Sequence, residues 1–433
     1  MDEDEAEDDN LVFDPRILLS PPIIDCPKCK EKGCFGVDRV AGNSCTKRCV
    51  CCQYSERADL PQLKKKIIYI DQFAISGMAK AVLSGDPGGS APMREEFWFK
   101  LFRVLNGLCR LQLIVCPTSE LHTQESEVDS RNLDFGRIYR TLSGELHFEP
   151  FLYIRQKQFL QHVKKWRQGT PNAPLALCAE EITGRALHDW WQPNRLIIQF
   201  PNWPKVGTET RKLRQDVASD ITIEFGGLAG CNGFDFLKQF RANVKNYAEG
   251  IIRGCRRQQA ARDLLAKGLP PADVEDLCPS AATMMAEAIV CGLSELGESP
   301  GDCPRLLGDY LVSDSLEYVP FIRISSMLYA AQARKFASGR KKPVGSSGVA
   351  DFDMIATLLP YCDTMFLDRE CCGLLSEEPL ISQLGYPCKV FSAKQSDEFL
   401  CFLTELGRSV SCEHIAVARS VYGPGIDRIL ELF

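Results

Sequence analysis

Acidic residues occupy four positions at the ends of predicted structural elements. Each position either follows an apolar run that is typical of a strand or begins the next helix. They are Asp71, Glu120, Asp353 with its neighbour Asp351, and Asp368. The carboxyl ends of parallel strands share one edge of a sheet, so these acids are expected to converge although they are far apart in sequence. Clustered carboxylates repel one another unless a cation compensates, and oxygen ligands suit Mg²⁺ or Mn²⁺. The chemistry such a site favours is phosphodiester hydrolysis with water as the nucleophile, assisted by one or two metal ions.

A second group of residues with metal-binding chemistry lies near the N-terminus. The cysteines Cys26, Cys29, Cys49 and Cys52 have the spacing C-x2-C-x19-C-x2-C. Each C-x2-C pair is typical of a tight turn called a zinc knuckle. Two knuckles together offer four thiolates to one tetrahedral zinc ion, as in a zinc ribbon. Cys51 competes with Cys52 for the fourth position. So short a segment has little apolar content to fold around without a metal, and it is expected to bind nucleic acid or protein rather than to catalyse.

The elements that position the acids are predicted to be short buried strands joined by helices. Continuous apolar runs at 66–70, 111–116, 364–367 and 387–391 are typical of parallel strands that are covered on both faces. Helical periodicity follows the first two runs and separates the last two. The sequence therefore predicts an α/β fold with a central parallel sheet.

The chain divides into five predicted segments. They are an acidic disordered tail (1–12), a zinc ribbon (13–60), a first α/β part (61–134), a mainly helical insertion (135–344) and a second α/β part (345–433). The tail is too poor in apolar residues to order itself. Its seven acids at residues 2–9 account for the net charge of −6, since the remainder carries 50 acidic and 51 basic residues.

Composition places the chain among ordinary globular proteins, with 45% hydrophobic and 25% charged residues. No run approaches the roughly 18 apolar residues that span a bilayer, and the acidic start is the opposite of a basic signal peptide. We therefore expect a cytoplasmic protein without a membrane partner. The 21 scattered cysteines are expected to be reduced. Several basic runs could neutralise phosphates, although solvated helix faces are the simpler interpretation of each.

The four acidic positions and their flanking residues resemble the PIN-like nuclease superfamily. The matching pieces are Ile-Tyr-Ile-Asp71, Cys-Pro-Thr-Ser-Glu120-Leu, Asp353-Met-Ile-Ala-Thr and Phe-Leu-Asp368. The resemblance covers residues 66–130 and 345–405, and it implies a three-layer α/β/α fold that cuts RNA more often than DNA with Mg²⁺ or Mn²⁺. The helical insertion is far longer than is usual in that family, and Asp351 remains an alternative to Asp353 as the third acid.

We therefore predict a metal-dependent nuclease that acts on RNA in preference to DNA and is able to form a homodimer. The competing interpretation is a non-catalytic module for binding nucleic acid or protein, in which the acids only cap helices and strand ends. Other conspicuous residues receive structural interpretations. His122 is predicted at the surface, Cys371 and Cys372 as buried thiols, Asp363 as a structural hydrogen-bonding group, and Trp190, Trp191 and Trp203 as packing residues.

Overall fold

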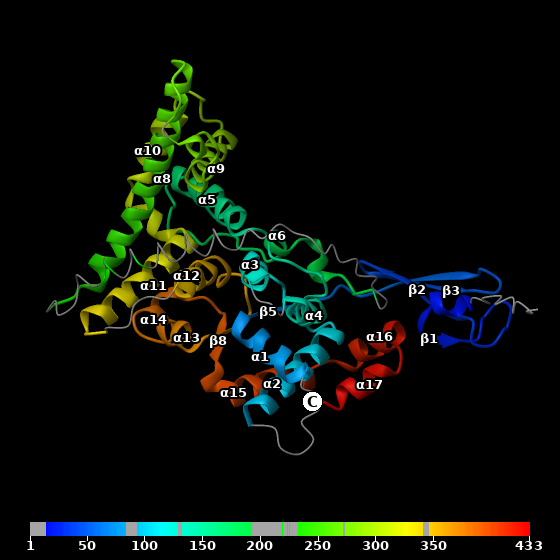
Figure 1. Cartoon of the computed structure of the whole chain (residues 1–433). Coiled ribbons are helices and arrows are strands. Elements are labelled where there is room, and N and C mark those ends of the chain that lie inside the picture. Colours follow the sequence, from blue (N-terminus) through cyan, green and yellow to red (C-terminus); the bar gives the residue numbers. More distant parts are fainter. Residues whose placement is uncertain are drawn as a thin grey trace, which may run out of the picture.

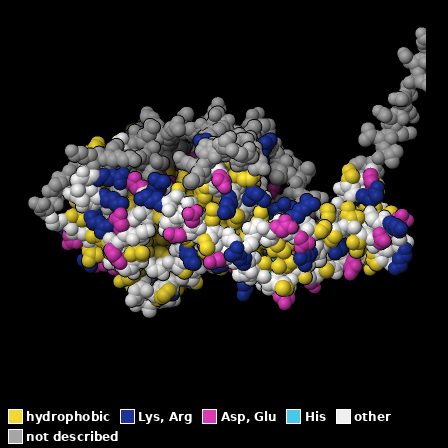
Figure 2. Space-filling model, turned by 90° about the horizontal axis from the view of Figure 1, so that it is seen from below, with side chains coloured by type: hydrophobic (Ala, Val, Ile, Leu, Met, Phe, Trp, Pro, Cys, Tyr) yellow, Lys and Arg dark blue, Asp and Glu magenta, His cyan; other side chains and the backbone are white. Residues whose placement is uncertain are grey.

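The computed structural model describes residues 14–83, 93–128, 132–192, 219, 223, 225, 233–271, 273–340 and 346–433. The predicted acidic tail and Trp203 lie outside this part of the chain. The described residues contain two separate four-stranded sheets, one of them small and N-terminal and the other central, with a tall helical arm rising beside the central sheet (Figure 1). Positive and negative side chains are interspersed over the underside of the molecule (Figure 2).

The N-terminal sheet is antiparallel, in the order β1-β2-β3-β4, and follows a short 3-10 helix, η1 (Pro15–Leu18). Its strands are β1 (Ser20–Ile24), β2 (Phe35–Ala41), β3 (Ser44–Cys49) and β4 (Ser55–Asp59). A two-residue turn joins β2 to β3, as expected from Gly42 and Asn43, and Gly42 takes the positive φ of 56° that such a turn requires. The small core beneath this sheet contains Phe35 and three buried cysteines rather than many large apolar side chains.

The central sheet is parallel throughout, in the order β6-β5-β7-β8, which confirms the predicted α/β class. Its strands are β5 (Lys66–Ile70), β6 (Ile114–Val115), β7 (Thr364–Leu367) and β8 (Lys389–Ser392). Strand β6 is shorter than the predicted run 111–116. Gln112 has a φ of 60°, and this left-handed conformation places a turn where the sequence suggested extended chain.

Helices cover both faces of the central sheet because alternate strand residues point to opposite sides. Ile68 and Ile70 contribute to a core with α1 (Gln72–Leu83), α2 (Met93–Arg110) and α15 (Ser396–Arg408). Ile67 and Tyr69 contribute to the core on the other face, where residues of α5 (Phe151–Arg167), α11 (Pro320–Ala337) and α12 (Ser346–Leu358) gather. The result is three layers, with the sheet in the middle.

The chain between β6 and β7 forms helices and loops wherever it is described, apart from one isolated bridge between Thr118 and His147. Besides α5, α11 and α12, its described helices are α3 (Glu120–Val128), α4 (Asn132–Ser143), α6 (Glu180–Thr183), η2 (Arg185–His188), α8 (Phe236–Ala266), η3 (Val274–Leu277), α9 (Ala281–Glu295), α10 (Cys303–Leu311) and η4 (Asp314–Tyr318). After β7 come α13 (Arg369–Leu375), α14 (Leu380–Leu384), η5 (Ala393–Gln395), α15, α16 (Cys412–Tyr422) and α17 (Gly425–Leu430). The long helix α8 and its neighbours α5, α9 and α10 make up the arm in Figure 1.

One described segment, Val274–Glu295, is long and apolar enough to cross a membrane by length and composition alone. In the fold it is divided, because η3 ends at Leu277 and α9 begins only at Ala281. Met285, Ile289 and Leu293 of α9 are buried in the large core. A core helix of this kind satisfies the same criteria, so the segment is weak evidence for a membrane span.

Candidate metal centre

Asp71 and Asp368 stand at the carboxyl ends of two neighbouring strands, β5 and β7. The sheet order reverses between these strands, since β5 has β6 on its other side, and open α/β sheets bind ligands at such a point. The N–H of Asp71 donates to the carbonyl of Phe366 across a distance of 3.1 Å. Both acids also immediately precede a helix, α1 or α13, where the positive end of the helix dipole favours a carboxylate.

Asp351 joins Asp368 in a compact cluster with Cys371. One ligand atom from each of the three residues lies within 4.8 Å of the others, so that the group has the dimensions to hold a metal ion. Asp368 caps α13 by accepting a hydrogen bond of 2.6 Å from the N–H of Cys371. Asp351 is only 8% exposed. The cluster therefore contains two oxygen donors held by adjoining helices, α12 and α13.

The thiol of Cys371 is neutral in this environment. Burial raises its pKa well above the ordinary value, and the charges of Asp351, Asp368 and Asp71 raise that pKa further. The prediction that Cys371 and Cys372 are buried thiols is confirmed. Because the thiol stays protonated, the carboxylate oxygens are the charged donors, and they match Mg²⁺ or Mn²⁺ better than zinc.

The carboxyl of Asp71 is strongly perturbed. Burial, followed by the charges of Glu125 and Asp368, raises its pKa from 3.8 to about 7, although the N–H groups of Gln72 and Asp368 act in the opposite direction. The charges of Glu125 and Asp368 therefore reach Asp71 across a partly solvated space at this edge of the sheet, since all three side chains are half-buried. A divalent cation in that space would remove both the desolvation cost and the repulsion.

Glu125, on α3, is the site residue that sequence reasoning did not single out. Its charge acts on Asp71 and also on Tyr69, the strand residue two positions before Asp71. Glu125 follows the buried Leu121 by four residues, which places it on the helix face that packs toward the sheet. That spacing was the available signal, and it identifies Glu125 better than Glu120.

His122 fixes α3 against the end of β5, and the prediction that it lies at the surface is wrong. It is only 2% exposed. Its Nε2 donates to the carbonyl of Ile70 at 3.0 Å, and its Nδ1 accepts from the N–H of Ser119 at 3.2 Å. Burial lowers its pKa to about 4, so that the ring is neutral near pH 7. The hydrogen bond thus attaches α3, the helix that carries Glu125, to Ile70, the residue that immediately precedes Asp71.

One of the predicted site residues pairs with Arg155 on α5, and the charge of a second acts on it. Asp353 forms an ion pair of 3.3 Å with Arg155, whose guanidinium also donates to the Thr357 hydroxyl at 3.0 Å. Burial lowers the pKa of Arg155, whereas the charge of Asp353 and, more weakly, that of Glu120 raise it. Residues two apart on a helix point in directions about 200° apart. Asp351 therefore joins the cluster at Asp368, whereas Asp353 does not.

The four cysteines of the predicted ribbon come together in the N-terminal sheet, with their sulfur atoms within 4.8 Å of one another. The Sγ atoms of Cys26 and Cys52 are 3.7 Å apart, and those of Cys29 and Cys49 are 3.8 Å apart. Four thiolates at about 2.3 Å from a central zinc would be separated by about 3.8 Å. The cluster is therefore able to hold a metal such as zinc.

Backbone N–H groups point at the first sulfur of each knuckle. The N–H of Cys52 donates to the Sγ of Cys49 at 3.4 Å, and that of Cys29 donates to the Sγ of Cys26 at 3.5 Å. These donors favour the thiolate form that a metal requires. Cys51, the competing ligand, is exposed and lies instead in a second group with Cys34 and Cys49.

Two other structural predictions are confirmed. Asp363 accepts a hydrogen bond of 2.8 Å from the N–H of Ile67 and pairs with Lys66 at 3.2 Å, which ties the starts of β5 and β7 together. Trp190 is 2% exposed and donates from Nε1 to the carbonyl of Pro61 at 2.8 Å.

Searches for related proteins found no matching family model, no matching curated protein and no matching solved structure. No relative therefore supplies a role for these acids and cysteines.

Proposed function

We propose that this chain is a metal-dependent nuclease with a PIN-like fold, which hydrolyses phosphodiester bonds of nucleic acid, RNA in preference to DNA. The observation that carries the proposal is the cluster of Asp351 and Asp368 at the carboxyl edge of a parallel sheet, beside the neighbouring strand that ends at Asp71, whose pKa the charges of Asp368 and Glu125 raise. The proposed ions are Mg²⁺ or Mn²⁺, because the charged donors are oxygens.

Each acid has a role that follows from its place. Asp351 and Asp368 supply ligands from one side, and Asp71, with Glu125 as the fourth acid, faces them from the end of β5. A bound Mg²⁺ or Mn²⁺ would supply charge neutralisation at the scissile phosphate and activation of the attacking water. His122 is a positioning residue, since it holds α3 and hence Glu125 through the carbonyl of Ile70.

The cysteine cluster complements this role as a structural zinc ribbon. Four thiolates from Cys26, Cys29, Cys49 and Cys52 would close a tetrahedral shell, whereas a catalytic zinc keeps one position open. The ribbon is therefore assigned to substrate or partner binding. The location that fits such a protein is the cytoplasm, where thiols stay reduced.

The test compares wild type with Asp71→Asn on labelled single-stranded RNA, single-stranded DNA and duplex DNA in the presence of Mn²⁺. We expect wild type to cleave RNA fastest and the variant to lose about 100-fold or more, which corresponds to about 3 kcal/mol of transition-state stabilisation. Equal rates for the two proteins would end the proposal. Absence of cleavage by wild type on all three substrates would favour the non-catalytic binding module.

A matched pair of variants on α3 tests the assignment of the second acid. Glu125→Gln and Glu120→Gln make the same chemical change five residues apart. We expect the first to lose cleavage to a similar extent as Asp71→Asn and the second to stay within about tenfold of wild type, because Glu120 acts on Arg155. If Glu120→Gln lost more cleavage than Glu125→Gln, the second acid of the site would be Glu120 and not Glu125.

A further inference from the structure

Helix α8 has one apolar side and one basic side. Phe240, Val244, Ala248 and Ile251 are buried in the large core, against α9 and α11. At about 100° per residue, the opposite side of the helix carries basic residues within an arc of about 120°. The exposed cations in this arc are Lys238, Arg241, Lys245, Arg253 and Arg256, and the exposed Glu249 lies among them beside Lys245. Lys238, Arg241, Arg253 and Arg256 are called the basic stripe.

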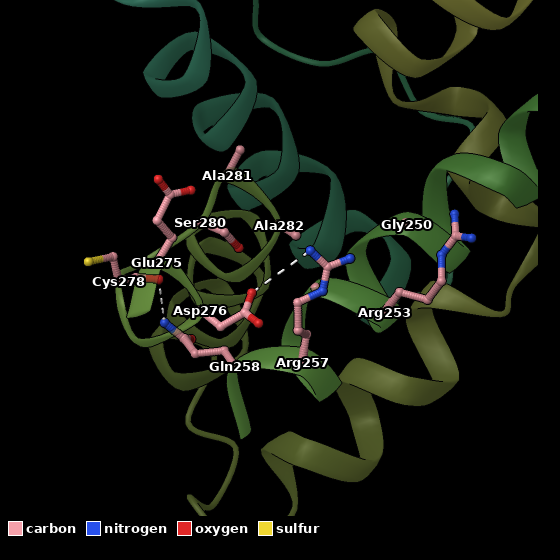
Figure 3. Close-up of a pocket in the computed structure, with 11 residues that line it drawn as sticks. Gly250, Arg253, Arg257, Gln258, Glu275, Asp276, Cys278, Ser280, Ala281 and Ala282 are labelled. Atoms are coloured by element: carbon pink, nitrogen blue, oxygen red, sulfur yellow. Dashed lines mark hydrogen bonds and ion pairs between the residues drawn. The ribbon is translucent and has the colours of Figure 1, made fainter. Parts of the chain in front are cut away.

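The four charges of the basic stripe are not neutralised by carboxylates within ion-pair distance in the described part of the chain. Neighbouring basic residues do have such partners, since Lys245 lies 3.9 Å from Glu249 and Arg257 lies 3.8 Å from Asp276. Figure 3 shows the contrast at the groove between α8 and the start of α9, where Arg257 reaches toward Asp276 and Arg253 extends away from it. Uncompensated arginines on a solvated face are available to an external anion.

The start of α8 is linked through Arg334 of α11 to the segment that follows α13. Phe236, at the start of α8, lies 5.6 Å from the guanidinium of Arg334. Arg334 in turn pairs at 3.2 Å with Glu377, just after α13, the helix that Asp368 caps. From there the stripe runs along the arm, away from the sheet (Figure 1). At 1.5 Å per residue, Lys238 and Arg256 are about 27 Å apart, which is long enough to contact several phosphates.

We infer that the basic stripe of α8 binds the phosphate backbone of a single-stranded nucleic acid and holds the substrate of the metal centre. The inference rests on the proposed function for the identity of the ligand. A row of exposed charges along one helix matches a repeating phosphate chain, because each phosphate contact adds independently to affinity through release of counterions.

The experiment measures binding of a fluorescent oligo-uridine RNA of about 20 nucleotides to the full chain without added Mg²⁺ or Mn²⁺, by anisotropy across a range of KCl concentrations. The variant is Arg241→Gln, Arg253→Gln and Arg256→Gln together. We expect affinity at about 100 mM salt to fall at least tenfold, and the slope of log K against log salt to decrease by about 2, since each single-strand phosphate contact contributes about 0.7.

The control makes the same change of charge on α2. Lys100→Gln, Arg103→Gln and Arg110→Gln together alter three exposed cations, and we expect less than a threefold loss of affinity. Equal losses from the two triple variants, an unchanged slope for the α8 variant, or equally tight binding of poly-glutamate would each overturn the inference. Matching circular dichroism spectra and melting curves show that the variants remain folded.

Failure of this inference is distinguishable from failure of the nuclease proposal. If wild type binds RNA through the stripe and never cleaves it, the nuclease proposal fails and the inference stands. If wild type cleaves RNA and the α8 variant keeps its KM, the inference fails alone. With both correct, the variant raises KM and leaves kcat near the wild-type value.

Discussion

Replacement of Asp71 by Asn should stabilise the metal-free protein at alkaline pH. Burial, with the charges of Glu125 and Asp368, raises the pKa of Asp71 from 3.8 to about 7. A carboxyl whose pKa is higher in the folded than in the unfolded state destabilises the fold when it ionises. This cost is absent below about pH 4, grows between about pH 4 and 7, and is complete above pH 7. The Asn side chain removes the charge and keeps an oxygen that accepts from the same N–H groups.

The size of the gain follows from the shift. About three pKa units at 1.36 kcal/mol each give a ceiling of about 4 kcal/mol. Because interacting carboxylates titrate as a group, part of this cost does not belong to Asp71 alone. We therefore expect the variant to gain about 2 to 4 kcal/mol at pH 8 and less than about 0.5 kcal/mol at pH 4.

Thermal melting and urea unfolding at both pH values, without added divalent ions, measure this gain. Mn²⁺ should stabilise wild type at pH 8, because it binds only the folded state, and should have little effect on the variant. Asp309→Asn, which changes an exposed acid on α10, serves as the control and should show no pH-dependent gain. The reasoning is refuted if wild type is as stable as Asp71→Asn at pH 8, or if the two variants behave alike.

The remaining predictions concern the third acid, the zinc ligands and the buried histidine. Asp351→Asn should abolish stabilisation by Mn²⁺, whereas Asp353→Asn should retain it and cost about 1 to 3 kcal/mol, because it leaves the mostly buried guanidinium of Arg155 without its charged partner; melting with and without Mn²⁺ checks both. Metal analysis should find one zinc per chain in wild type and in Cys51→Ser but little in Cys52→Ser, and equal contents in the two variants would contradict the assignment of the fourth ligand. His122→Phe should cost about 1 to 3 kcal/mol at pH 8, since it leaves the Ile70 carbonyl without its buried donor. The loss should be smaller at pH 6, by somewhat under about 1 kcal/mol, because the histidine of the unfolded state gains a proton near pH 6.5 while the folded ring, with a pKa of about 4, stays neutral; the same loss at both pH values would contradict the lowered pKa.

The strands and their direction were accessible from sequence because the signal is local. The run Lys66–Ile70 is apolar at consecutive positions, which is typical of a strand covered on both faces, and the acid after it marks where the strand leaves the core. The same holds for Thr364–Leu367 and Asp368. Strand β6 shows the limit of such signals. The apolar residues before Ile114 are buried as well, but the left-handed Gln112 starts a turn among them.

The cysteine cluster was equally accessible, because two short knuckles fix the positions of their own sulfurs through nearby N–H groups. The burial of His122 was not accessible from its position in the sequence. Its ring lies against Tyr69, with centroids 5.0 Å apart, and its partner carbonyl belongs to Ile70 on another element. Those contacts exist only once α3 is packed against β5.

The sequence by itself determined that acids follow the two central strands and that two cysteine pairs have metal-binding spacing. Both depend on chain direction and on residues only a few positions apart. The tertiary structure placed Asp351 rather than Asp353 beside Asp368, and it brought the charge of Glu125, which the sequence analysis did not name, to act on Asp71. Each placement depends on how a helix is rotated about its own axis, and packing against the sheet and against Arg155 sets that rotation.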